Sequence, residues 1–166
     1  FDFHGHTHPE GRIELGYKLT ADNLREDDAT IDTLAYTSSA KHLETQSGLP
    51  FSDIINGAGN LGALFNHPTA GNASGYLSVP SDDLRAPSVG ESYFQGGYVV
   101  ETHGSQDGGT VDGIQAEFPR WLRADNWESQ DDMLSSFGSY VLPTFLETLY
   151  GTLCGLCVSC VVLRRE

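Results

Sequence analysis

Residues 1–10, with the sequence FDFHGHTHPE, decide the fold that we expect for the rest of the chain. Phe1 and Phe3 alternate with Asp2 and His4, as in a β-strand that places its aromatic side chains on the core face. The two polar side chains then share the opposite face of that strand. This polar pair predicts a functional site, with the Asp2 carboxylate close enough to hold a neighbouring histidine.

Three histidines crowd onto the end of this strand and the loop that follows it. Gly5 and Pro9 interrupt the strand pattern, so His4, His6 and His8 are expected at its C-terminal end. That edge of an α/β sheet is where ligands bind, and neutral imidazoles are good ligands for zinc. The alternative is a histidine-rich turn without a metal, or a histidine hydrogen-bonded at the strand end. A catalytic zinc site needs about three protein ligands and a structural site about four, so this stretch alone cannot complete either.

Length and charge limit the classes of function. The 166 residues are enough for one folded domain, and a hydrophobic content of 39% favours a folded protein. A net charge of −14 with nine Lys and Arg residues argues against nucleic-acid binding. Because Phe1 is not an initiator methionine, we expect the C-terminal portion of a longer protein. The acidic composition and a single sequon at Asn72 are compatible with a cytoplasmic or a secreted protein.

The chain is expected to form one domain in residues 1–151, followed by a cysteine-containing apolar tail in residues 152–166. Cys154, Cys157 and Cys160 all lie in this tail, so disulfide bonds do not stabilise the domain in residues 1–151. Their spacing resembles that of iron–sulfur ligands, but a fourth cysteine is missing. Residues 140–163 are apolar over the span of a membrane, but they include a glutamate, a proline and two glycines. Neither an iron–sulfur protein nor a membrane protein is therefore favoured.

Hydrophobic periodicity predicts a mixture of strands and helices. A helical pattern begins after the capping residue Thr20 and extends to about residue 44, either continuously or with a break at residues 37–39. The segment 48–80, rich in Gly, Pro, Ser and Asn, is expected to be loop apart from one or two helical turns at 61–65. The remaining predicted elements are strands at residues 13–19, 98–103 and 111–118 and an amphipathic helix at 127–150.

A glutamate in the last of these strands is a candidate general base. Glu117 lies between Ala116 and Phe118, where a carboxylate is partly buried and needs a cation, a donor or an ordered water. In a dry pocket it could take a proton from an attacking water molecule. The alternative is a structural ion pair with Arg120 or Arg123.

Two further side chains are candidates for substrate binding. His103 precedes a glycine-rich loop and could hydrogen-bond a substrate or an oxyanion, although a structural role is the alternative. Arg120 could bind a substrate carboxylate through two hydrogen bonds, or it could be solvated or ion-paired.

Four stretches taken together resemble the N-formylglutamate amidohydrolase family. They are DFHGH at residues 2–6, YFQGGY at 93–98, HGS at 103–105 and IQAE at 114–117, in the family's order and spacing. The resemblance extends over nearly all of residues 1–151. It implies a relative of the zinc carboxypeptidases and aspartoacylases, with an α/β phosphorylase/hydrolase-like fold of three αβα layers around a mixed sheet.

The resemblance also implies roles for individual residues. His4 corresponds to a zinc ligand and Glu117 to the general base, while Gly96 and Gly97 belong to the segment expected to border the substrate. Asp2 would orient the ligand histidine. His6 and His8 would support the site in the same way or serve as alternative ligands.

Two departures from the family pattern affect the prediction. The family's other zinc ligands, a histidine and an acidic residue, would precede Phe1, so the chain is a C-terminal portion, or His6 and His8 substitute, or the zinc site is incomplete. The first interpretation is favoured. Family members often carry an arginine just before the histidine that corresponds to His103, whereas Thr102 stands here, which weakens the prediction of N-formylglutamate as substrate.

The predicted function is zinc-dependent hydrolysis of an amide bond in a small N-acyl amino acid or peptide. The alternative is a catalytically inactive member of the family that binds a ligand or partner. The expected partner is a small-molecule substrate, and neither a nucleic acid nor a membrane.

Overall fold

The computed structural model describes residues 1–67 and 76–122. The strands in these ranges are β1 (Asp2–His6), β2 (Ile13–Gly16), β3 (Ser78–Val79) and β4 (Gln115–Pro119). The α-helices are α1 (Ala21–Arg25), α2 (Asp28–Leu34), α3 (Lys41–Ser47), α4 (Phe51–Asn56), α5 (Leu61–Asn66) and α6 (Tyr98–His103). Two 3-10 turns, η1 (Ala35–Thr37) and η2 (Gln106–Gly108), complete the described elements.

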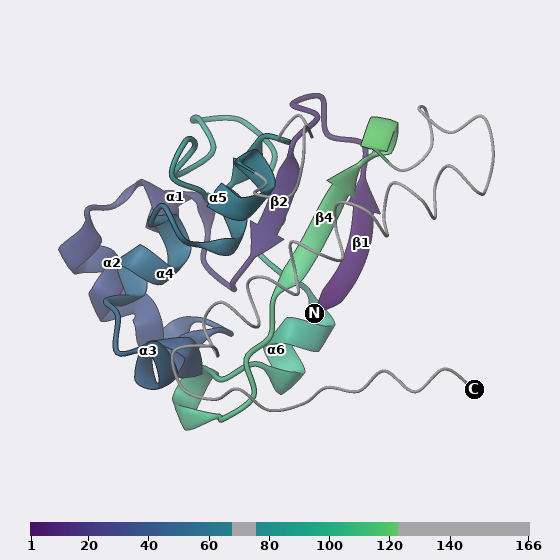
Figure 1. Cartoon of the computed structure of the whole chain (residues 1–166). Coiled ribbons are helices and arrows are strands. Elements are labelled where there is room, and N and C mark those ends of the chain that lie inside the picture. Colours follow the sequence, from purple (N-terminus) through teal and green to yellow (C-terminus); the bar gives the residue numbers. More distant parts are fainter. Residues whose placement is uncertain (68–75, 123–166) are drawn as a thin grey trace, which may run out of the picture.

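The strands form one mixed sheet in the order β1-β4-β2-β3. Figure 1 shows β4 between β1 and β2. Strand β4 runs parallel to β1 and antiparallel to β2, and β3 runs parallel to β2. The first strand of the chain therefore pairs with the last described one, more than a hundred residues later. This arrangement confirms the predicted α/β class with a mixed sheet.

The register gives the sheet a polar face and an apolar face. Glu117 of β4 lies opposite His4 of β1 on one side and opposite Glu14 of β2 on the other. Residues that pair directly across neighbouring strands point to the same face of a sheet. We define the polar face by Asp2, His4, His6, Glu14, Gln115 and Glu117.

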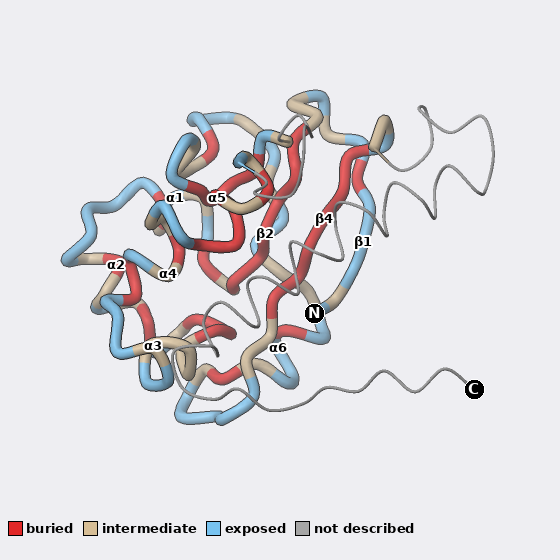
Figure 2. The backbone as a smooth tube through the Cα atoms, in the orientation of Figure 1, coloured by how far each residue is buried: buried red, intermediate tan, exposed pale blue. Residues whose placement is uncertain are grey.

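The apolar face is covered by the helices of the first half of the chain. Side chains of β2 and β4 on this face join one core cluster with residues of α1, α2, α4 and α5: Ile13, Leu15, Leu24, Ile31, Phe51, Ile55, Leu61, Phe65, Ala116 and Phe118. In Figure 2, β2 and β4 are buried along their length. This helical layer fixes the positions of the two central strands, and so the positions of Glu14 and Glu117.

Phe3 of β1 and Phe1, directly before this strand, lie on the predicted face but are not core residues. Phe3 stacks on Phe118 and on Phe1, with ring centroids 6.2 Å and 6.1 Å apart. Phe1 and Phe3 are nevertheless 45% and 49% exposed. The expected face is correct, but β1 is at the edge of the described sheet, where a strand has a neighbour on only one side, and these aromatic side chains are only partly covered (Figure 2).

Local sequence signals account for the helix boundaries. The Thr20 hydroxyl accepts the Asn23 amide N–H while the Asn23 side chain accepts the Thr20 amide N–H, which is a capping box at the start of α1. Asp27 caps α2 in the same manner by accepting from the Thr30 amide. The predicted cap at Thr20 and the short helix at 61–65 are confirmed. The helical segment after Thr20 is interrupted close to residues 37–39, as in the predicted alternative, but it has a further break at residues 26–27, so it forms three α-helices and not two.

Two element predictions were wrong. Residues 98–103 form α6 and not a strand. In this helix Tyr98 and Val99 are exposed and Val100 is buried. The β-branched composition of this segment was overridden by its tertiary context. Helix α4 was missed inside the predicted loop, although Pro50 followed by Phe51, Ile54 and Ile55 is a helix-start signal with helical spacing.

Several predictions lie outside the described residues. These are the helix at 127–150, the tail at 152–166 with its three cysteines, and Arg123. Among the helices of residues 1–67 and 76–122, none has the length and hydrophobicity needed to cross a membrane.

Candidate active site

The two glutamates of the polar face are both buried but differ in their hydrogen bonding. Glu14 is 0% exposed, and each of its oxygens has a donor. His8 Nδ1 lies 3.0 Å from Glu14 Oε1, and the Phe94 amide donates to Glu14 Oε2 at 2.8 Å. Glu14 is therefore fixed in one orientation by a side chain and by a backbone group.

Glu117 is 3% exposed and has a free oxygen. Gln115 Nε2 donates to Glu117 Oε1 at 2.8 Å, but Glu117 Oε2 is buried and accepts no hydrogen bond from the described residues. A buried polar atom without a partner is costly, by about 1–3 kcal/mol, and such atoms are often found at functional sites. The atom is available to accept a proton, a ligand donor or a cation.

Each histidine of the N-terminal stretch holds one ring nitrogen against an oxygen atom. His4 Nε2 lies 2.9 Å from Asp2 Oδ1, His6 Nε2 lies 2.8 Å from the Arg12 carbonyl, and His8 Nδ1 faces Glu14. Because carbonyl and carboxylate oxygens only accept, these nitrogens carry the protons. Metal-binding histidines are commonly oriented by such a bond.

The second ring nitrogens of the histidines have different surroundings. The side chain of His4 is 50% exposed, so its Nδ1 can reach a ligand from solvent. His6 is buried, and its Nδ1 accepts the His8 amide N–H at 3.0 Å. His4 and His8 thus keep a lone pair outside the described hydrogen bonds, whereas both nitrogens of His6 are engaged.

The loop before α6 packs over β2 and closes the site on the side of Glu14. The Phe94 ring stacks on His8 with centroids 4.6 Å apart and an interplanar angle of 13°. Tyr93 donates its hydroxyl to the Leu15 carbonyl at 2.6 Å, and burial together with the nearby Tyr17 and Glu14 raises the pKa of this phenol. Tyr93 is therefore a protonated anchor for the loop.

Arg12 carries a buried positive charge that forms an ion pair with the carboxylate of Glu91. Its Nη1 donates to Glu91 Oε2 at 2.7 Å and its Nη2 to the Ser92 carbonyl at 3.2 Å. The hydrogen bond from Arg12, helped by the Ser88 amide, lowers the pKa of Glu91. Arg12 is neutralised by Glu91. The buried carboxylates of Glu14 and Glu117 therefore leave the polar face with an excess of negative charge, which favours a cation.

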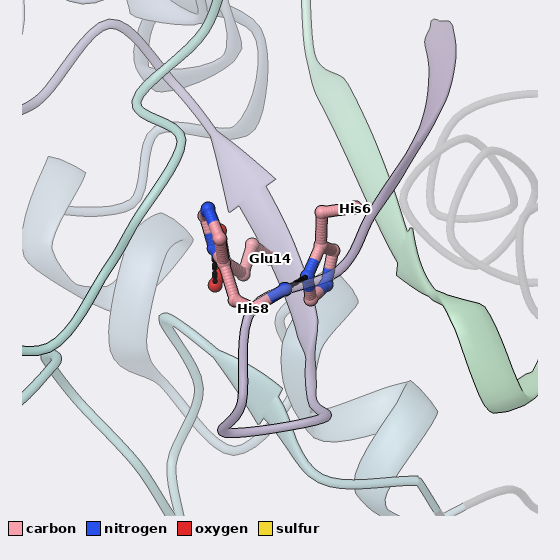
Figure 3. A group of neighbouring side chains, drawn as sticks. All are labelled: His6, His8 and Glu14. Atoms are coloured by element: carbon pink, nitrogen blue, oxygen red, sulfur yellow. Dashed lines mark hydrogen bonds and ion pairs between the residues drawn. The ribbon is translucent and has the colours of Figure 1, made fainter.

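One group of side chains on this face has the composition of a metal site. A ring nitrogen of His6, a ring nitrogen of His8 and a carboxylate oxygen of Glu14 lie within 4.8 Å of one another (Figure 3). Tetrahedral zinc with bond lengths of about 2.1 Å places its ligand atoms about 3.4 Å apart, so these side chains would have to approach slightly. Binding through His6 Nδ1 would also cost the hydrogen bond from the His8 amide, worth about 0.5–1.5 kcal/mol. The residues fit a three-ligand zinc site with these two adjustments and with replacement of the hydrogen bond between His8 Nδ1 and Glu14 Oε1.

The structure brings together only some of the residues predicted from the sequence. Asp2, His4, His6 and Glu117 share the polar face, and His8 reaches its border through Glu14. His103 is exposed at the C-terminal end of α6, without a described hydrogen bond to the polar face. Arg120 is exposed directly after β4.

Gly96 and Gly97 serve the packing of the loop against the sheet. A Cβ atom on Gly97 would lie 3.0 Å from Gln115 Oε1, and one on Gly96, which has a φ of +124°, would lie 2.5 Å from Val100 Cγ2. These contacts explain why glycine is needed here, and the predicted role in substrate binding stays a prediction.

A cavity of about 590 Å³ lies elsewhere in the fold. Its lining includes Tyr17, Leu43, Ile54, Leu61 and Ile114, and none of the residues that define the polar face. It is therefore distinct from the site described above.

Sequence reasoning missed Glu14 and Phe94. Glu14 alternates with Ile13 and Leu15 directly after the histidine loop, the same signal that identified Glu117. Phe94 gave no comparable signal, because its contact with His8 joins residues far apart in the chain.

Comparison with known proteins adds no assignment. No family model matches the chain, and no curated protein or solved structure is significantly similar to it.

Proposed function

We propose that this chain contributes the catalytic face of a zinc-dependent hydrolase that cleaves an amide bond in a small N-acyl amino acid or peptide. The observation that carries the proposal is the position of Glu117 between His4 and Glu14 on the polar face, where one oxygen of its buried carboxylate has no hydrogen-bond partner among the described residues. The resemblance to the N-formylglutamate amidohydrolases supports the choice of amide hydrolysis.

His4 is the proposed ligand that this chain contributes to the metal. Asp2 holds His4 Nε2, so Nδ1 is the nitrogen left for coordination. When bound, zinc would supply a Lewis acid that polarises the scissile carbonyl and makes a water molecule more acidic. The roles predicted for His103 and Arg120 in substrate binding are kept as proposals.

Glu117 is the proposed general base. Its Oε2 would accept a proton from the attacking water as the new C–O bond forms, and would return that proton to the departing amine nitrogen as the C–N bond breaks. Gln115 holds the other carboxylate oxygen, so Oε2 keeps one orientation during the reaction. The low exposure of Glu117 excludes bulk water that would compete for this oxygen.

The test is turnover of N-formyl and N-acetyl amino acids by the zinc-supplemented protein, measured as release of free amine. Glu117→Gln should lower kcat by at least about 100-fold, because the amide cannot take a proton. Glu101→Gln, an exposed glutamate on α6, is the matched control and should keep wild-type turnover. Equal turnover of the wild type and Glu117→Gln would rule out the proposed base.

The second candidate function is ligand binding without hydrolysis. It is favoured because His103, which was predicted to assist catalysis, is exposed at the end of α6 and makes no described hydrogen bond to the polar face. A wild-type protein that is thermally stabilised by N-acyl amino acids, but releases no amine with zinc present, would support binding alone.

A further inference from the structure

We propose that His6, His8 and Glu14 form a binding site for a divalent transition-metal ion of the zinc class. This site uses neither His4 nor any residue outside the described part of the chain. It therefore goes beyond the proposed hydrolysis and can stand without it.

The ligand atoms converge from three positions. His6 ends β1, His8 lies in the loop after it, and Glu14 lies in β2, which is separated from β1 by β4 in the sheet (Figure 3). His8 Nδ1 and Glu14 Oε1 are 3.0 Å apart in a hydrogen bond. A metal ion bound by both atoms would replace this hydrogen bond, with the two atoms moving to the separation of about 3.4 Å expected between ligands of tetrahedral zinc. The ring nitrogen of His6 completes a group whose members all lie within 4.8 Å.

The atoms of these side chains that would not bind the ion are anchored by the backbone. His6 Nε2 donates to the Arg12 carbonyl, and Glu14 Oε2 accepts the Phe94 amide N–H. The His8 ring is held by stacking on Phe94. Hydrogen bonds on the far side of each ligand are the usual means of orienting it toward a metal.

A second, independent observation is the charge beside the group. Glu117 is the register partner of Glu14, is 3% exposed, and has a carboxylate oxygen without a described partner. The buried cation Arg12 is already paired with Glu91. Two adjacent buried carboxylates are best compensated by a cation, and imidazole with carboxylate selects a zinc-like ion.

Burial distinguishes this group from a second group of possible metal ligands in the described residues. His67, Asp82 and Asp83 also lie close together, but all three are exposed. Exposed carboxylates can remain charged in water without an ion. His67 is therefore a suitable control for histidine substitution.

The experiment measures metal binding and does not depend on turnover. The full 166-residue chain, without a histidine tag, is made in a background in which Cys154, Cys157 and Cys160 are serine, because thiolates also bind zinc. After removal of metal by a chelator, Zn²⁺ is titrated in competition with a chromophoric chelator, and Co²⁺ absorption reports the coordination geometry.

We expect the parent protein to bind zinc, and Glu14→Gln and His8→Gln each to weaken this binding at least about tenfold. His67→Gln should leave it within about twofold. Circular dichroism of the metal-free variants shows whether each is folded. If Glu14→Gln fails to fold, His8→Gln decides, since the His8 side chain is partly exposed and its loss leaves Glu14 with the Phe94 hydrogen bond.

The metal site would be overturned if the parent protein bound no zinc, or if folded His8→Gln kept the zinc affinity of the parent protein. It would also be overturned if zinc binding were lost only in His4→Gln. The proposed hydrolysis fails separately, when amine release is absent or survives Glu117→Gln. Zinc binding that depends on His8 and Glu14 in a protein without turnover would support the metal site and reject the enzyme.

Discussion

The two buried glutamates of the polar face carry the same charge but have different capacities for chemistry. Glu14 is saturated by His8 and the Phe94 amide, so its carboxylate is already oriented. Glu117 keeps one oxygen free of described hydrogen bonds. The difference comes from the loop that covers Glu14, and it separates the proposed metal ligand from the proposed base.

The ion pair between the buried Arg12 and the partly exposed Glu91 leads to a pH-dependent prediction. The folded protein lowers the pKa of Glu91 from its ordinary value of 4.5, mainly through the hydrogen bond from Arg12. The stabilisation of the folded protein by the ionised Glu91 carboxylate is therefore complete above pH 4.5, and it is lost as the pH falls through the lower pKa that Glu91 has in the folded state. Glu91→Gln should reduce the free energy of unfolding at pH 7, as measured by urea denaturation.

The difference between wild type and Glu91→Gln should shrink as the pH falls below the ordinary value of 4.5. Glu101→Gln provides the control, because this exposed glutamate has no described ion pair. A difference of constant size from neutral to acidic pH would contradict the assigned cause.

At the scale of elements, short helices depend on their first turn. Helix α1 has five residues, so few of its backbone hydrogen bonds are internal and its capping box satisfies amides that would otherwise be unpaired. Leu24 is the buried residue that attaches this helix to the core. The cap and this one contact together set the direction of the chain after β2.

Thr20→Ala should lower the free energy of unfolding by about 1 kcal/mol, because it removes the hydroxyl that accepts the Asn23 amide N–H. Urea denaturation at neutral pH measures the change. Thr20→Ser retains the acceptor and should be close to wild type. Equal losses in the two variants would show that the methyl group, and not the cap, is responsible.

At the scale of the whole molecule, the site depends on close contact between β2 and the loop before α6. A Cβ atom on Gly16 would lie 2.6 Å from the Gly96 amide nitrogen and 2.7 Å from the Gln95 carbonyl carbon. The same loop carries Phe94, which orients Glu14 and stacks on His8. Packing of backbone on backbone thus links segments about eighty residues apart in the sequence.

Gly16→Ala should destabilise the protein by about 1–3 kcal/mol, since the backbone atoms that it meets cannot move aside without shifting the loop. It should also weaken zinc binding if His6, His8 and Glu14 are the ligands. Gly59→Ala is the matched control, because a Cβ atom there meets nothing within 4 Å. Wild-type stability of Gly16→Ala in thermal unfolding would contradict the described packing.

The sequence alone determined the features that arise from local chain geometry. Alternation placed Asp2 and His4 on one face of β1 and buried Glu117 within β4, and the cap at Thr20 began α1 where expected. These predictions hold because side-chain direction in a strand, and amide exposure at a helix start, depend only on residues nearby in the chain.

Tertiary structure alone decided which partners each of these side chains meets. It made residues 98–103 a helix and left Phe1 and Phe3 half exposed. It gave both oxygens of Glu14 a hydrogen-bond partner, while one oxygen of Glu117 has none within residues 1–67 and 76–122. It also joined His8 to Glu14 and Phe94. The physical reason is that strand order, register and loop packing depend on contacts between distant segments, and the hydrophobic period of one segment does not specify its neighbours.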